Sequence, residues 1–99
     1  MAFTMEERDG RRILKIEGPM TIYEAVDIRD ELFKHFEVTG SMSLALDGVT
    51  ECDTAGVQLL CAARRTGREE GKTFCIENPS RAVVEAIAQM GLNAGDFGE

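Results

Sequence analysis

The sequence predicts an α/β fold: a four-stranded mixed sheet in the order β-β-α-β-α-β-α, with helices packed mainly on one face. Three observations predict it. Segments with strand and helix periodicity alternate, which favours parallel strands joined by right-handed crossovers. The chain opens with two strand-like segments around a turn, which makes one pair antiparallel. Finally, 99 residues suit one domain, 1–99, and four strands are too few to bury three amphipathic helices generously on both faces.

The opening hairpin is predicted from the dipeptide Asp9-Gly10 between two strand-like segments, 3–7, which is the weaker, and 12–17. Asp-Gly between two such segments is typical of a tight β-turn. Gly18-Pro19 is expected to end the second strand.

The first helix is expected over residues 21–36. Thr21 and Glu24 form a capping-box pattern, in which the Thr oxygen accepts from the N–H three residues on and the Glu side chain reaches back. Apolar residues then recur at helical spacing, which predicts a buried stripe. Its members are Ile22, Ala25, Val26, Leu32, Phe33 and Phe36.

The rest of the chain predicts strands at 41–47 and 72–77 and helices at 54–70 and 79–90. Asn78-Pro79 is expected to be the N-cap and first residue of the last helix, because proline there gives up only an N–H without a helical partner. The buried stripe of that helix would comprise Val83, Val84, Ile87 and Met90, with Gly91 as its stop. The tail at about 93–99 is expected to be loose.

Charge and hydropathy exclude several classes of partner. The net charge is −7, so the chain is unsuited to nucleic acid, whose binding depends on lysine and arginine. Anionic membranes are disfavoured for the same reason. No apolar stretch approaches the ~20 residues that span a bilayer, and the first residues lack the apolar core of a signal peptide. We therefore expect a cytoplasmic protein that does not insert into membranes.

Neither a metal site, a cofactor nor an enzyme is indicated. The three cysteines, Cys52, Cys61 and Cys75, contain no Cys-x-x-Cys pair and are expected to be free thiols. The only histidine, His35, has no evident nucleophile partner. A receiver domain phosphorylated on Asp47 is disfavoured. Such domains need an acidic pair after the first strand and a lysine at the end of a late strand, whereas here Glu17 is followed by Gly18-Pro19, and Lys72 begins the last strand.

The junction between the third strand and the second helix holds the candidate site. Asp53 and Thr54 fall at a helix start, where free N–H groups and the helix dipole favour negative charge. A phosphate on Thr54 would gain from that field, and Gly56 would let another backbone or a ligand approach closely. Asp-Thr before a helix is also ordinary N-capping, so the pattern alone leaves both interpretations open.

The segment Asp53-Thr54-Ala55-Gly56-Val57-Gln58-Leu59-Leu60, preceded by Leu44-Ala45-Leu46-Asp47-Gly48-Val49, resembles the STAS domain (sulfate transporter and anti-sigma factor antagonist). The resemblance extends over nearly the whole chain and implies the STAS-like form of the fold above. It implies an anti-sigma factor antagonist, which is not an enzyme and has no cofactor.

In that family the Ser or Thr after the first Asp of the motif is phosphorylated, which is Thr54 here. The unmodified form binds an anti-sigma factor, often a serine/threonine kinase; phosphorylation ends that binding and a phosphatase reverses it. The partner-binding residues implied are Asp47, Asp53, Thr54, Ala55, Gly56 and Gln58. Ala55 stands where many members have a second hydroxyl, which leaves Thr54 as the only acceptor in the motif.

Two alternatives within the same fold stay open. The segment Thr21-Ile22-Tyr23-Glu24-Ala25 and the Asp-Thr-x-Gly form also resemble the STAS subunits of phospholipid-transport ATPases, in which this helix start docks onto the ATPase subunit. STAS proteins also serve as adaptors in chemotaxis signalling.

Overall fold

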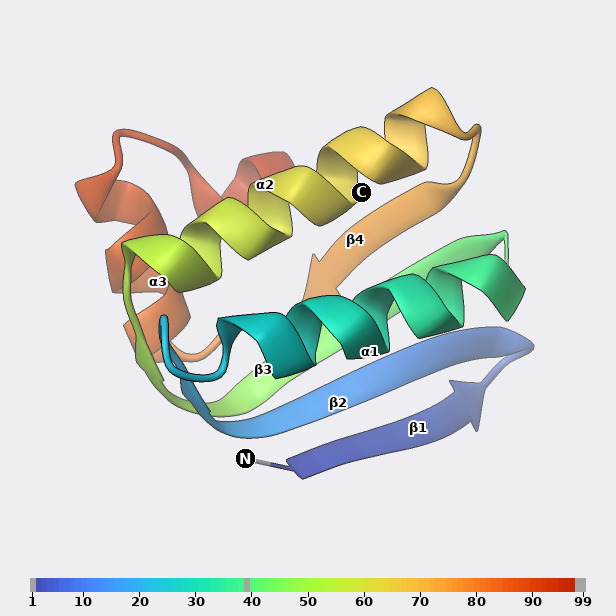
Figure 1. Ribbon diagram of the computed structural model, residues 1–99, viewed down its shortest axis with the longest axis horizontal. Coiled ribbons are helices and arrows are strands. Elements are labelled where there is room, and N and C mark those ends of the chain that lie inside the picture. Colours follow the sequence, from blue (N-terminus) through green and yellow to red (C-terminus); the bar gives the residue numbers. More distant parts are fainter. Residues whose placement is uncertain (1, 39, 98–99) are drawn as a thin grey trace.

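The computed structural model describes residues 2–38 and 40–97, and these residues form the predicted four-stranded mixed sheet with three α-helices. The sheet order is β1-β2-β3-β4 (Figure 1). The strands are β1 (Ala2–Arg8), β2 (Arg11–Met20), β3 (Ser41–Cys52) and β4 (Thr73–Glu77). The helices are α1 (Ala25–Val38), α2 (Thr54–Glu69), α3 (Arg81–Gln89) and a short 3-10 helix, η1 (Ala94–Phe97).

The β1–β2 hairpin turns at the predicted dipeptide. Asp9 (φ 55°) and Gly10 (φ 80°) both adopt left-handed backbone, which a two-residue hairpin turn of type I′ requires. β1 pairs antiparallel with β2, whereas the β2–β3 and β3–β4 pairs are parallel. β3 therefore lies inside the sheet, with hydrogen-bonded partners on both sides.

The core lies between the three helices and one face of the sheet. Leu14 and Leu44 are register partners on β2 and β3, and both are fully buried against the helices. Figure 1 shows α1 and α2 running side by side over the sheet, with α3 beside the start of α2. Each helix contributes a buried stripe, and burying a side chain of this size contributes about 1.5–3 kcal/mol. The stripes are Ile28, Leu32 and Phe36 on α1, Val57, Leu60 and Ala63 on α2, and Val83, Ala86 and Ile87 on α3.

The opposite face of the sheet is crossed by polar side chains. The Arg11 guanidinium donates to Ser43 Oγ at 3.2 Å and to Glu77 Oε2 at 3.0 Å, so it spans β2, β3 and β4. Arg8 reaches Glu77 Oε1 at 3.4 Å. The helices pack on the other face of the sheet, where the apolar core lies.

The start of α1 differs from the prediction. Residues 22–24 form a turn, in which Glu24 N–H donates to the Thr21 carbonyl at 3.0 Å, and the helix begins at Ala25. Half of the capping box forms, because Glu24 Oε1 accepts from Thr21 N–H at 2.8 Å, but the Thr21 hydroxyl oxygen accepts from Tyr23 N–H. The buried stripe expected here was wrong for Ile22, Val26 and Phe33, which are all exposed.

β2 and β3 are longer than predicted. β2 continues through Gly18-Pro19 to Met20, with register shifts that accommodate the interruption. β3 continues to Cys52, because Gly48 to Cys52 pair with this extension of β2. Asp47 therefore lies within β3 and does not end the strand.

The last helix begins later than predicted. Ser80 is its N-cap, with Oγ accepting from Val83 N–H at 3.3 Å. Asn78 has a left-handed backbone (φ 46°), which a residue capping the start of a helix does not adopt. Val84 and Met90 are exposed, against the prediction, whereas Gly91 (φ 76°) follows the helix end as expected.

The tail was expected to be loose, but its described part is anchored. Residues 94–97 form η1, and Phe97 is 1% exposed within the core. The Arg64 guanidinium lies 5.2 Å from the centre of the Phe97 ring, a cation–π arrangement. An aromatic residue two positions from the end of the chain thus fixes the tail; residues 98–99 lie outside the described part.

Candidate functional site

The candidate site is formed where β3 passes directly into α2. β3 ends at Cys52 and α2 begins at Thr54, so Asp53 alone joins them. Asp53 has an extended backbone and is the N-cap of α2, with Oδ1 accepting from Gly56 N–H at 3.1 Å. The cap fixes the orientation of the first turn of α2 relative to the end of the strand.

The same carboxylate also holds the turn before α1. Asp53 Oδ2 accepts from Ile22 N–H at 3.0 Å. The connection from β2 to α1 and the connection from β3 to α2 are therefore held side by side at the carboxyl ends of two parallel strands, the usual place for function in an open α/β sheet.

Thr54 is the first residue of α2, and its side chain is exposed. Within the described residues, its hydroxyl makes no hydrogen bond. Gly56 N–H is satisfied by the Asp53 side chain and Val57 N–H by the Asp53 carbonyl, whereas no described residue accepts from the N–H of Thr54 or Ala55. The hydroxyl is thus accessible at the positive end of the helix dipole.

Gly56 has a structural role that differs from the one expected. It is buried, and a Cβ atom there would lie 2.4 Å from the Met20 carbonyl oxygen and 2.9 Å from Cys52 Sγ. The close approach that glycine permits is used by the chain's own β2 strand. Gly56 therefore sets how tightly α2 packs on the sheet, and its position is buried against Met20 and Cys52.

The structure brings together only part of the predicted partner-binding set. Gln58 is exposed one helical turn after Thr54, and Ala55 is half-buried beside it. Asp47 is exposed but lies six residues before Asp53, about 20 Å of strand at ~3.3 Å per residue. The structure thus brings together Asp53, Thr54, Ala55 and Gln58, and it places Asp47 apart from them.

Two exposed residues at the site were not predicted to belong to it. Ile22 and Tyr23 lie in the turn held by Asp53 and are 64% and 90% exposed. Large apolar side chains in a turn beside a polar junction are typical of contact surfaces. The sequence signal for this surface is the adjacent pair Ile22-Tyr23, two large apolar residues between Thr21 and Glu24.

Cys52, next to Asp53, is a half-buried free thiol. Burial, together with the neighbouring Asp53 carboxylate, raises the pKa of Cys52 to about 11. The thiolate, which is the nucleophile and metal ligand, is therefore disfavoured at neutral pH.

Within residues 2–38 and 40–97, no group of three or more His, Cys, Asp or Glu side chains is arranged to hold a metal ion. In the same part of the chain, none of the helices combines the length and the apolar character needed to cross a membrane. The arrangement offers an exposed threonine hydroxyl at the first residue of α2.

Comparison with protein families finds one model that matches residues 3–97, described as Mlab, STAS domain. No curated protein sequence is similar enough to this chain to count as a match.

Solved structures share the fold. The unphosphorylated form of the anti-sigma factor antagonist SpoIIAA is 18% identical, with a TM-score of 0.74 over 99% of this chain and 86% of that one. The phosphorylated form of the Bacillus cell fate determinant SpoIIAA is 16% identical, with a TM-score of 0.71 over 99% and 89%. The structure of Mglu is 23% identical, with a TM-score of 0.66 over 79% of this chain and 20% of that one. At these identities the matches establish the fold.

Proposed function

Because this chain belongs to the STAS domain family, we propose that it acts as an anti-sigma factor antagonist controlled by phosphorylation of Thr54. In this proposal the unmodified form binds an anti-sigma factor that is also a serine/threonine kinase, in the cytoplasm. Phosphorylation of Thr54 ends the binding, and a phosphatase restores it. The chain acts by binding and catalyses no reaction.

The observation that carries the proposal is the position of Thr54. Its hydroxyl is exposed at the first residue of α2 and has no hydrogen-bonding partner among the described residues, so a kinase can reach it without unfolding the helix. The N–H groups of Thr54 and Ala55 and the helix dipole offset part of a phosphate's charge, so the fold tolerates the modification.

A phosphate on Thr54 should weaken the binding of a partner, although the fold itself tolerates it. Phosphorylation adds about −1.5 to −2 charges, beside the carboxylate that Asp53 already supplies. Burying an unpaired dianion at an interface costs considerably more than the 1–3 kcal/mol of one lost hydrogen-bonded contact. An interface built on the unmodified hydroxyl, with Asp53, Ala55 and Gln58 around it, should therefore dissociate.

The test uses a serine/threonine kinase that co-purifies with this chain, with ATP, and measures phosphorylation by mass spectrometry and binding by calorimetry. We expect a single phosphate on Thr54 and none on Thr54→Ala, which still binds the kinase. Thr54→Glu should fold normally and lose the partner. Thr4→Glu, at an exposed threonine on β1, is the matched control and should bind as the wild type does. Wild-type binding by Thr54→Glu would contradict the switch, and unfolding of Thr54→Glu would assign Thr54 a purely structural role.

A second candidate is a STAS subunit of a phospholipid-transport ATPase. The family model that matches residues 3–97 is described as Mlab, STAS domain. The segment that resembles those subunits, Thr21 to Ala25, also lies beside Asp53 through the Ile22 hydrogen bond. Co-purification separates the candidates: capture of an ATPase subunit, with no phosphate on Thr54, favours the second.

A further inference from the structure

β1 forms an open edge of the sheet. Figure 1 shows it as the outermost strand, and it pairs with β2 on one side only. The ladder between them runs without a register shift from Ala2, opposite Glu17, to Arg8, opposite Arg11. β1 therefore contains neither the bulge nor the proline that commonly keeps an edge strand from pairing with another chain.

The hairpin turn determines which main-chain groups of β1 face outward. In a two-residue turn of type I′, the flanking residues, here Arg8 and Arg11, exchange main-chain hydrogen bonds with each other. Pairs along an antiparallel ladder alternate, so the N–H and C=O groups of the even-numbered residues of β1 face β2. Those of Phe3, Met5 and Glu7 face outward, where no described residue bonds to them.

The same edge leaves apolar side chains incompletely covered. Phe3 and Met5 pack against the hydrophobic core but are only half-buried. They lie one strand beyond β2, whose core-facing residues Leu14 and Ile16 are fully buried. A strand added beside β1 would pair the outward main-chain groups and cover the exposed parts of these two side chains.

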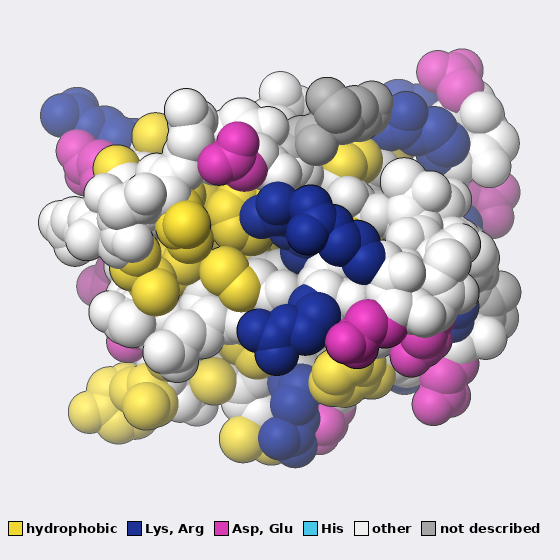
Figure 2. Space-filling view, turned by 90° about the horizontal axis from the view of Figure 1, so that it is seen from above, with side chains coloured by type: hydrophobic (Ala, Val, Ile, Leu, Met, Phe, Trp, Pro, Cys, Tyr) yellow, Lys and Arg dark blue, Asp and Glu magenta, His cyan; other side chains and the backbone are white. Residues whose placement is uncertain are grey.

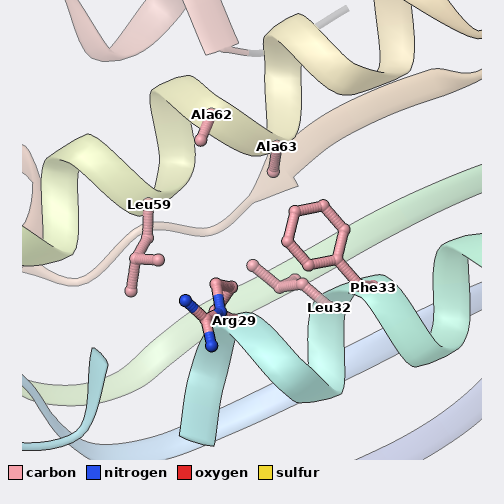
Figure 3. Close-up of a pocket in the computed structure, with 6 residues that line it drawn as sticks. All are labelled: Arg29, Leu32, Phe33, Leu59, Ala62 and Ala63. Carbon is pink, nitrogen blue, oxygen red and sulfur yellow. The ribbon is translucent and has the colours of Figure 1, made fainter. Parts of the chain in front are cut away.

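The opposite edge and the helical side of the described chain are less suited to dock another chain. β4, at the opposite edge, is five residues long and has η1 packed beside it. Between α1 and α2, Leu32, Phe33 and Leu59 line a pocket of about 60 Å³ (Figure 3), far below the ~300–1,000 Å³ of ordinary ligand sites. Figure 2 shows Lys and Arg side chains standing among hydrophobic and acidic ones on the α2 side, so charge selects no single partner there.

We propose that two copies of this chain pair antiparallel through β1, which joins their sheets into one continuous sheet. The two-fold axis passes between the Thr4 residues of the two copies. Phe3 of each copy lies opposite Met5 of the other, and the outward N–H and C=O groups of these two residues bond to each other. The pairing uses β1 alone and leaves the Asp53–Thr54 junction exposed, so it is independent of the proposed function.

Side-chain chemistry selects this register and a second copy as the occupant. Two threonines directly opposite each other, and an aromatic ring beside a methionine sulfur, are both favourable cross-strand neighbours. Registers centred on Glu6 or Glu7 would place two carboxylates opposite each other, which destabilises a sheet. A register centred on Met5 would put Phe3 opposite Glu7 and leave its ring without an apolar neighbour. The uncharged half of β1 is therefore complementary to itself.

Sedimentation equilibrium of the full chain over a concentration series tests the pairing. The wild type should shift from monomer to dimer as concentration rises, since an interface confined to one pair of strands is small and therefore weak. Thr4→Glu and Thr4→Lys should each weaken the dimer roughly fivefold or more, because each puts like charges opposite each other across the two-fold axis. An equimolar mixture of the two variants should restore the dimer, because a carboxylate then faces an ammonium group.

Thr73→Glu, at an exposed threonine of the other edge strand, is the matched control and should dimerise as the wild type does. A wild type that stays monomeric at every concentration would overturn the proposal. So would a dimer that Thr4→Glu leaves intact, or one that the mixture of variants fails to restore. Binding of the kinase is measured separately and does not require the dimer, so either experiment can fail without the other.

Discussion

Asp53 and Ile22 are joined by a hydrogen bond from the Ile22 N–H to Asp53 Oδ2, 3.0 Å long, which ties the turn before α1 to the start of α2. The other oxygen of that carboxylate accepts from Gly56 N–H. One side chain therefore caps a helix and positions a neighbouring connection that is remote in sequence.

We expect Asp53→Ala to lower the free energy of unfolding by about 1–2 kcal/mol, because it removes a helix cap and a second hydrogen bond. Asp53→Asn should cost about half as much, since its oxygen can still cap α2 while its NH2 group would face the Ile22 N–H. Urea denaturation measures both. Ser80→Ala, which removes the single-bond cap of α3, is the control and should be milder than Asp53→Ala. Equal stability of Asp53→Ala and the wild type would show that the carboxylate does not hold the junction.

Gly56→Ala should destabilise the fold by about 2 kcal/mol or more, even though alanine favours helices by about 1 kcal/mol over glycine. The new Cβ would lie 2.4 Å from the Met20 carbonyl oxygen, so α2 must move away from β2. Gly67→Ala on the same helix is the graded control, because its nearest atom, the Lys72 carbonyl oxygen, is 3.1 Å away. Thermal melts compare the two, and a higher melting temperature for Gly56→Ala would refute the close approach.

Phe97→Ala should lower the free energy of unfolding by about 3–5 kcal/mol, the usual cost of removing a buried aromatic side chain. The loss would include the cation–π contact with Arg64. Leu92→Ala, at an exposed apolar position before η1, should change it by about 0.5 kcal/mol or less. If chemical denaturation found the two variants alike, the tail would not be anchored as described.

Cys52 should make stability depend on pH in the alkaline range. Its pKa is raised from an ordinary 9.0 to about 11, so the folded state holds the thiol proton more tightly than the unfolded state does. The unfolded chain therefore binds fewer protons between these two values, and stability falls as pH rises through this window. The free energy of unfolding of the wild type minus that of Cys52→Ala, measured by urea denaturation, should be constant below pH 9 and should decrease from there to about pH 11. A difference that stayed flat throughout would contradict the raised pKa.

Local chemistry made the hairpin and the start of α2 predictable from sequence. Asp9-Gly10 fits a turn with two left-handed residues, and Asp53 followed by apolar helical spacing fits an N-cap. The start of α1 was not predictable in this way, because the Thr21–Glu24 pattern also fits the isolated turn that the chain adopts.

The remaining differences come from tertiary contacts. The end of β3 is polar and resembles a loop, and it is a strand because it pairs with the extension of β2. The small apolar pocket that Phe33 and Leu59 both line depends on how α1 and α2 pack together, which spacing within either helix does not determine. The burial of Phe97 likewise needs the space that the packed helices leave.

The central position of β3 has a consequence for how the chain folds. Among the described strands, only β1 and β2 pair without a helix between them; Ile13 pairs with Ser43 across α1, and Ser41 pairs with Thr73 across α2. Parallel pairing over such separations costs loop-closure entropy before the stabilising contacts can form. We therefore expect the parallel pairs to form late. We expect the hairpin to form first and β3 to complete both ladders in the slow step. Until then, β2 exposes an open edge to neighbouring molecules, and refolding yield should fall as protein concentration rises.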